Sequence, residues 1–241
     1  LGVNAGNSIA SGGNYNVVVG DEAGTALTTG DANVAVGYQA LSTEDGHGFN
    51  TAIGYQSLKT QNAGGSAFNT AVGYGAGLAV TTGIQNTLIG GSAGDALTDA
   101  DANVAVGRAA LTTDTLGSQS VAIGSRALNA QNFTTATNSY NTAVGADAGL
   151  AVTTGIKNTI IGGLAGDAIT TGNNIVAVGY QALSYDQQGS GSVAIGNQAL
   201  TTQRFTTATS VHNVAVGQQA GQEITTGIEN TIIGGLAGDA L

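Results

Sequence analysis

A short motif recurs along the whole chain at an almost constant spacing, and this period limits the possible folds more than any other feature. The motif is Asn–(Val/Thr)–Ala–(Val/Ile)–Gly, as in residues 33–37, 50–54 and 69–73. Most copies follow one another after 17 residues, with one interval of 19 and two of 21. The thirteen copies close at Gly20, Gly37, Gly54, Gly73, Gly90, Gly107, Gly124, Gly145, Gly162, Gly179, Gly196, Gly217 and Gly234. A period this short predicts a coil in which each turn packs on the next.

A longer period of 72 residues lies over the short one, because residues 73–77, 145–149 and 217–221 match one another. Four turns therefore form one larger repeat. Leu1 and Gly2 resemble the tail of a fourteenth copy, and both ends of the sequence fall inside a turn. We therefore expect residues 1–241 to form a single β-solenoid domain of about 14 turns that is a segment of a longer fibre.

Each copy of the motif places β-branched residues directly before a glycine, which predicts a short strand followed by a bend or a close backbone approach. The chain contains 40 Gly and no Pro. Helical repeats are excluded because each interior glycine costs about 1 kcal/mol relative to alanine. The absence of proline suits stacked strands, since proline removes a ladder hydrogen bond. The sequence predicts an all-β chain with a parallel β-roll or β-solenoid architecture.

The two faces of the predicted strand are both apolar. The residue before the closing glycine is Val or Ile, and the residue two positions earlier is Val or Thr, so these two share a face. The residue between them is Ala in nine copies and Val, Leu or Ile in the other four. A solenoid buries one of these faces inside its coil. The apolar character of the other face predicts that a second copy of the chain covers it.

The composition excludes several classes of function. The net charge is −10 with five basic residues, so nucleic acid and anionic membranes are poor partners. The chain has no cysteine, which removes disulfides and thiol chemistry. No apolar run approaches the length of a membrane span. His47 and His212 lie many turns apart, so no local catalytic constellation can form and we expect neither an enzyme nor a cofactor or metal.

Residues 120–124 and 192–196 both read SVAIG, and residues 50–58 read NTAIGYQSL. These segments resemble the YadA-like head repeats of trimeric autotransporter adhesins and the NTAIGYQAL repeats of phage tail fibres. The resemblance implies a left-handed parallel β-roll, a homotrimeric rod, and adhesion outside the cell, on the cell surface or on a virion tail fibre. The turns here are longer than those of YadA-like heads, which predicts longer outer loops.

The two 21-residue turns contain the residues most suited to contact a host surface protein or glycan. Each of these turns adds a Phe and, later in the turn, Tyr140 or His212. The 19-residue turn carries Phe68 in a related position. The alternative, which we favour, is that each Phe fills the gap between loop and coil. The candidate contact residues are Phe68, Phe133, Tyr140, Arg204, Phe205 and His212.

Two further sets of residues recur at fixed positions in the turn. Tyr38, Tyr55, Tyr74 and Tyr180 directly follow a closing glycine, and asparagine opens most copies. A row of tyrosines could bind a ligand, but stacking of the rings along the coil is the simpler expectation. Stacked asparagines that hydrogen-bond along the coil likewise need no ligand.

The sequence thus predicts a structural fibre segment that projects or mediates attachment, in a bacterial adhesin or a phage fibre. The alternative is a monomeric β-solenoid that binds ice through Thr pairs such as Thr81–Thr82, or calcium through the Asp95 and Asp167 turns. The wide spacing of these aspartates and the interrupted Thr pairs disfavour both ligands. A glycan hydrolase would need paired carboxylates about 5–10 Å apart in a groove.

Overall fold

A computed structural model describes residues 2–239, and these residues form strands and turns with no helix among them. They fall into two compact units, the first with residues 2–119 and 133–138 and the second with residues 120–132 and 139–239. Each unit is a β-solenoid of parallel stacked strands. The predicted all-β class and parallel solenoid architecture are therefore confirmed for the described residues.

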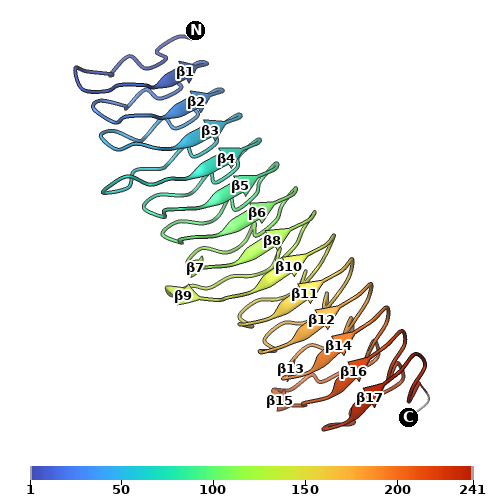
Figure 1. The fold of residues 1–241 in the computed structure, drawn as a ribbon. Coiled ribbons are helices and arrows are strands. Elements are labelled where there is room, and N and C mark those ends of the chain that lie inside the picture. The colour runs from blue at the N-terminus through green and yellow to red at the C-terminus, as the bar shows by residue number, and fades with distance from the viewer. Residues whose placement is uncertain (1, 240–241) are drawn as a thin grey trace. The chain divides into compact units, whose positions relative to one another are not determined.

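In unit 1, strands β1 to β6 stack in chain order, each hydrogen-bonded to the next as a parallel pair (Figure 1). Equivalent motif positions face one another, as Val34 faces Thr51 and Val36 faces Ile53. A separate parallel pair joins β7 to β9. The strands are β1 (Val17–Val19), β2 (Val34–Val36), β3 (Thr51–Ile53), β4 (Thr70–Val72), β5 (Thr87–Ile89), β6 (Val104–Val106), β7 (Gly117–Ser118) and β9 (Thr137–Asn138).

Unit 2 repeats this arrangement, with one strand for each motif copy and a second short pair between β13 and β15 (Figure 1). The 21-residue turns keep the motif in register, since Thr142 pairs with Val121 across one of them. Extra residues are therefore accommodated outside the ladder. The strands are β8 (Val121–Ile123), β10 (Thr142–Val144), β11 (Thr159–Ile161), β12 (Val176–Val178), β13 (Gly189–Ser190), β14 (Val193–Ile195), β15 (Thr209–Ser210), β16 (Val214–Val216) and β17 (Thr231–Ile233).

The number of turns is about thirteen, one for each three-residue strand, and not the predicted 14. The tail of the expected fourteenth copy includes Leu1, which lies outside the described residues. Residues 3–8, which follow it, form turns without a strand. The difference arises because a ladder strand needs the three residues before the closing glycine.

The interior of each unit is lined by the middle residue of every strand. Ala35, Ala52 and Leu88 in unit 1 and Ala143 and Ile160 in unit 2 are fully buried. The residues on either side of them point outward and are partly exposed. This confirms the predicted alternation of the two faces and shows that the middle residue is the inward one. The small Ala side chains leave room for a layer of buried leucines, including Leu41, Leu58, Leu111, Leu128, Leu183 and Leu200.

The asparagine that opens most turns forms a buried hydrogen-bonded ladder, as predicted. Asn33 Oδ1 accepts a hydrogen bond from the backbone N–H of Asn50 at 3.0 Å, and Asn69 Oδ1 accepts one from Asn86 at 2.8 Å. The side-chain amides donate to backbone carbonyls 14 residues further along, as Asn86 Nδ2 does to Ala100 O at 2.7 Å. Each side chain thus pairs main-chain groups that the coil would otherwise bury without partners.

The glycine that closes each motif is required by the approach of two backbones. Gly37 and Gly54 have φ of +132° and +138°, a conformation that disfavours residues with a side chain. A Cβ atom at Gly54 would also overlap the carbonyl oxygen of Gly73, the equivalent glycine in the next turn. The predicted bend and close backbone approach therefore both occur at this position.

Candidate interaction surface

The outward face of the strands presents a continuous row of β-branched side chains in each unit. In unit 1, Val36, Ile53, Val72 and Ile89 face one another in consecutive strands. In unit 2 the same row runs through β8 to β17 and includes Ile123, Val144, Ile161, Val178 and Ile195. The isoleucines at this position are about two-fifths exposed, as at Ile161 with 39%, except in the last strand, where Ile233 is more exposed. We call this surface the outer strand row.

A second row of side chains projects from the residue directly before the motif. This residue adopts a left-handed conformation in every turn where it is not glycine, for example at Phe49 with φ +65° and Phe68 with φ +54°. The Phe49 and Phe68 rings stack with centroids 5.1 Å apart and an interplanar angle of 19°. Phe68 is 53% exposed, so this predicted contact residue lies on the surface. Phe49 was not among the predicted contact residues, although its place directly before Asn50 could have revealed it.

Tyr140 and His212 belong to the same left-handed position in unit 2, with φ of +51° and +54°, and both are exposed. Phe68 therefore corresponds to Tyr140 and His212. Phe68 is thus related to these two residues of the longer turns and not to Phe133 and Phe205. The physical reason is that the insertions of the longer turns precede the left-handed residue, so position must be counted backward from the next motif.

Phe133 and Phe205 lie inside the coil, with 6% and 9% of their surface exposed. Phe133 packs beside Gly117, and its backbone N–H donates to Asp114 Oδ1 at 2.9 Å. The Phe205 N–H donates in the same way to Asp186 Oδ1 at 3.0 Å. These two rings fill the interior of the long turns, so they do not present a receptor-contact surface.

Three of the four tyrosines after the closing glycine form a stacked row in unit 1. Tyr38 and Tyr55 have ring centroids 5.2 Å apart, and Tyr55 and Tyr74 have centroids 5.1 Å apart with nearly parallel planes. The stacking interpretation is confirmed for these three residues. Tyr180 belongs to unit 2, where the equivalent positions of the neighbouring turns are Gly163 and Asn197, which offer no ring.

Arg204 lines an open surface pocket of about 430 Å³ in unit 2, together with Tyr185, Thr202, Thr225 and Thr226. The lining residues carry one aromatic ring, four hydroxyls and a guanidinium group. Tyr185 was not predicted, although it stands where the corresponding turns carry Thr43 and Thr113.

The interior also contains carboxylates that sequence analysis did not single out. Glu44, Asp114 and Asp186 occupy equivalent positions in the turn and are fully buried. Burial raises the pKa of Glu44 above its ordinary value, and the neighbouring His47 acts in the opposite direction. Counting from the motif asparagine could have revealed these residues, because the same position carries Leu27, Val80 and Leu97 in other turns.

The two aspartates of the candidate calcium turns accept hydrogen bonds from hydroxyl groups one turn away. Ser184 Oγ donates to Asp167 Oδ1 at 2.6 Å, and Thr112 Oγ1 donates to Asp95 Oδ1. These carboxylates therefore connect successive turns within each unit.

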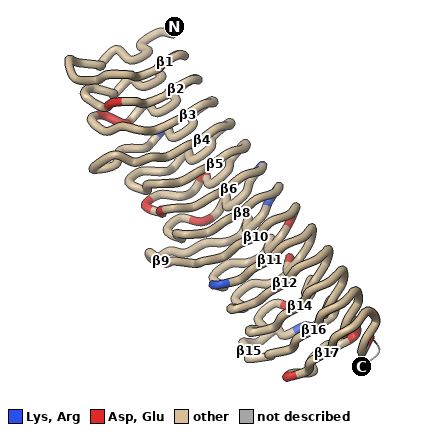
Figure 2. The backbone as a smooth tube through the Cα atoms, viewed as in Figure 1, with Lys and Arg blue, Asp and Glu red and all other residues tan. Residues whose placement is uncertain are grey.

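Charged residues are sparse along the backbone of both units, and acidic positions outnumber basic ones (Figure 2). Among residues 2–239, no helix has the length and apolar character needed to cross a membrane. No protein-family model, no curated protein and no solved structure matches this chain.

Proposed function

We propose that this chain is a structural fibre segment of an extracellular, cell-surface or virion adhesin, in which three copies of a left-handed coil pack side by side. The observation that carries the proposal is the outer strand row, a surface of Val and Ile side chains that recurs at the same register in every turn. Parallel sheets are ordinarily covered on both faces, and this row is the uncovered one.

A second copy of the same chain is the partner that best fits this row. The row repeats with the period of the coil, and only a surface with the same period can meet every turn in the same way. Another copy aligned around a rotation axis satisfies this requirement, because a closed symmetric assembly places equivalent turns at equal height. The side chains of the row are uncharged, so their burial between two copies leaves no charge without a partner.

The solution mass of the chain tests this assembly. Light scattering after size exclusion is expected to give three times the chain mass of 23.4 kDa. The double substitution Ile161→Glu with Ile195→Glu is expected to yield monomers, because it places charges within the buried interface. The matched control, Thr206→Glu with Thr207→Glu, adds the same charge to an exposed loop and should leave the mass unchanged. A monomeric wild-type chain would contradict the proposal.

Attachment to a host protein or glycan is the second part of the proposal. The exposed candidates Phe68, Tyr140 and His212 lie at left-handed positions, and Arg204 lines the pocket with Tyr185. A ring for stacking and hydroxyl and guanidinium donors together suit a carbohydrate. We expect the wild type to bind to a glycan array, and we expect the double variant Tyr185→Ala with Arg204→Ala to lose this binding. If the wild-type trimer binds no glycan or surface protein, the segment is a spacer and this second part is wrong.

A further inference from the structure

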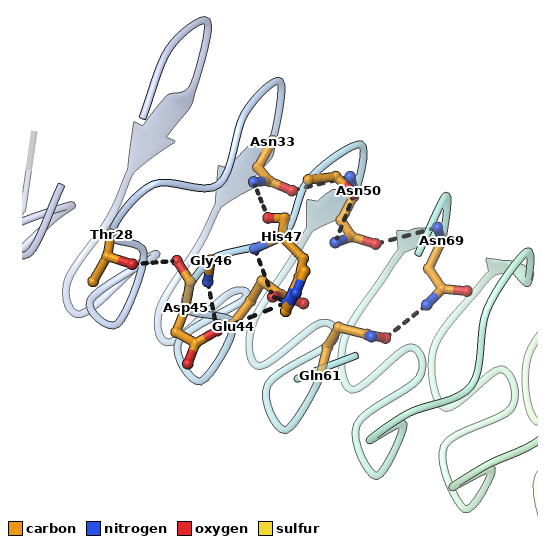
Figure 3. A network of polar contacts seen from close by, with 10 residues as sticks. Thr28, Asn33, Glu44, Asp45, Gly46, His47, Asn50, Gln61 and Asn69 are labelled. Carbon is orange, nitrogen blue, oxygen red and sulfur yellow. Dashed lines mark hydrogen bonds and ion pairs between the residues drawn. The ribbon is translucent and has the colours of Figure 1, made fainter. Parts of the chain in front are cut away.

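One turn of unit 1 brings an imidazole and two carboxylates together at the edge of the coil interior. His47 Nδ1 lies 3.3 Å from Glu44 Oε1 and 3.8 Å from Asp45 Oδ1 (Figure 3). Each of the three residues offers a metal-ligand atom, and these atoms all lie within 4.8 Å of one another. Glu44 is buried, His47 is partly exposed and Asp45 is exposed, so the cluster extends from the interior to the solvent.

The backbone that carries this cluster is held by hydrogen bonds from the preceding turn and from the asparagine that opens its own turn. Asp45 O accepts hydrogen bonds from the backbone N–H and the hydroxyl of Thr28, at 2.6 and 3.0 Å. His47 O accepts a hydrogen bond from Asn33 Nδ2 at 3.0 Å (Figure 3). These hydrogen bonds fix the backbone from which the Asp45 and His47 side chains project, which lowers the entropy cost of binding a ligand.

Two of the inward-facing atoms lack hydrogen-bond partners. Glu44 has 0% of its surface exposed, and its Oε2 is buried without a partner. His47 Nδ1 is also buried and makes no hydrogen bond, despite its short distance to Glu44 Oε1. A buried carboxylate without full hydrogen bonding is strongly unfavourable, so a cation between these atoms would remove the penalty.

The equivalent turns of the repeat provide an internal comparison. Asp186 occupies the position of Glu44, and it accepts hydrogen bonds from the N–H groups of Gly189 and Phe205 and from Gln203 Nε2. Gly189 stands at the position of His47, and a Cβ atom there would overlap Asp186 Oδ2. The aspartate turn is thus closed by its own hydrogen bonds and has no room for an imidazole.

The Glu44 turn departs from this pattern in three places at once. It has a longer acid, a histidine in place of the glycine, and Asp45 where the equivalent residues are Thr115 and Gln187. Gln61, which corresponds to Gln203, has its Nε2 buried without a hydrogen-bond partner, so the glutamine–acid hydrogen bond of the Asp186 turn is absent. Glu44 Oε1 still accepts a hydrogen bond from the His47 backbone N–H at 3.3 Å, as Asp186 does from Gly189, but Glu44 Oε2 has no partner and an imidazole now stands beside the carboxylate.

We propose that Glu44, Asp45 and His47 bind one divalent transition-metal ion of the Zn²⁺ class. Imidazole and carboxylate ligands together suit such ions better than they suit calcium or magnesium. Zn–N and Zn–O distances of about 2.0–2.1 Å in a tetrahedron place ligand atoms about 3.3–3.4 Å apart. The separation of 3.3 Å between Glu44 Oε1 and His47 Nδ1 fits this geometry, whereas Asp45 Oδ1, 3.8 Å from His47 Nδ1, must move closer when the ion binds. Three protein ligands leave the fourth position for water on the exposed side.

Calorimetric titration of the metal-free 241-residue chain with Zn²⁺ tests the proposal. The wild type is expected to bind one ion per chain, and His47→Ala and Glu44→Gln are each expected to weaken binding by about 100-fold. His212→Ala is the matched control, because His212 is the other histidine of the chain and lies in unit 2. This variant should bind Zn²⁺ like the wild type.

Thermal melting separates lost binding from lost folding. In chelator, Glu44→Gln should melt no lower than the wild type, because it removes a buried charge with an unpartnered oxygen. Zn²⁺ should raise the melting temperature of the wild type and of His212→Ala, but not that of His47→Ala. Absence of saturable binding, or binding that survives His47→Ala, would overturn the proposal and leave an ion pair between His47 and Glu44 as the role of the cluster.

Discussion

Replacing Gly54 with alanine is expected to destabilise the fold by about 3 kcal/mol or more. Two effects add at this position. The backbone has φ of +138°, which an alanine adopts only with strain, and the new methyl group would overlap the carbonyl oxygen of Gly73. Because that oxygen belongs to the backbone of the next turn, it cannot move without displacing the ladder. The change should therefore be measurable as a large decrease in the melting temperature.

Gly64→Ala and Gly65→Ala are the matched controls for this prediction. Both glycines lie in the same 19-residue turn, and a Cβ atom at either would meet no heavy atom within 4 Å. They should melt close to the wild type or slightly above it, because alanine reduces the freedom of the unfolded chain. Equal melting of Gly54→Ala and these controls would show that the closing glycine is not required by the approach of successive turns.

Replacing Asn158 with alanine is expected to lower the free energy of unfolding by about 2–4 kcal/mol. The substitution removes the side-chain hydrogen-bond partner of each of two buried backbone groups. Asn158 Oδ1 accepts a hydrogen bond from Ile175 N at 3.0 Å, and its Nδ2 donates to Gly172 O at 2.9 Å. The side chain is fully buried, so water does not replace these bonds without opening the coil. The melting temperature gives the overall effect.

Amide hydrogen exchange locates the effect of this substitution. The Ile175 amide should exchange faster in Asn158→Ala than in the wild type, because its side-chain acceptor is gone. Asn197→Ala, at an exposed asparagine after a closing glycine, is the control and should change neither melting nor exchange at Ile175. Unchanged exchange at Ile175 would mean that the asparagine ladder is not what protects the backbone.

The repeat predicted most of the fold because the same residue type recurs at the turn positions where the backbone has the same structural requirement. Glycine follows each strand where two backbones meet, and asparagine precedes each strand where buried main-chain groups need partners. The same regularity predicted the stacked tyrosines. Where the turns keep one length, a position in the sequence therefore corresponds directly to a position in space.

The candidate contact residues were predicted less well, because the long turns break that correspondence. Phe133 and Phe68 both lie in extended turns, yet one ring is buried and the other is exposed. The left-handed residue before the motif projects its side chain outward, whereas the inserted Phe enters the space beside Gly117. Residue type alone does not distinguish these two environments.

The sequence by itself determined the period, the parallel register, the closing glycines, the asparagine ladder and the apolar character of both strand faces. These follow from demands that repeat identically in every turn. Only the tertiary structure decided which rings are buried, and that Glu44 and His47 converge with unpartnered atoms where Asp186 is fully bonded. The physical reason is that these features arise where one turn differs from its neighbours by a substitution or an insertion. The effect of such a difference depends on the space that the surrounding packing leaves for the changed side chain.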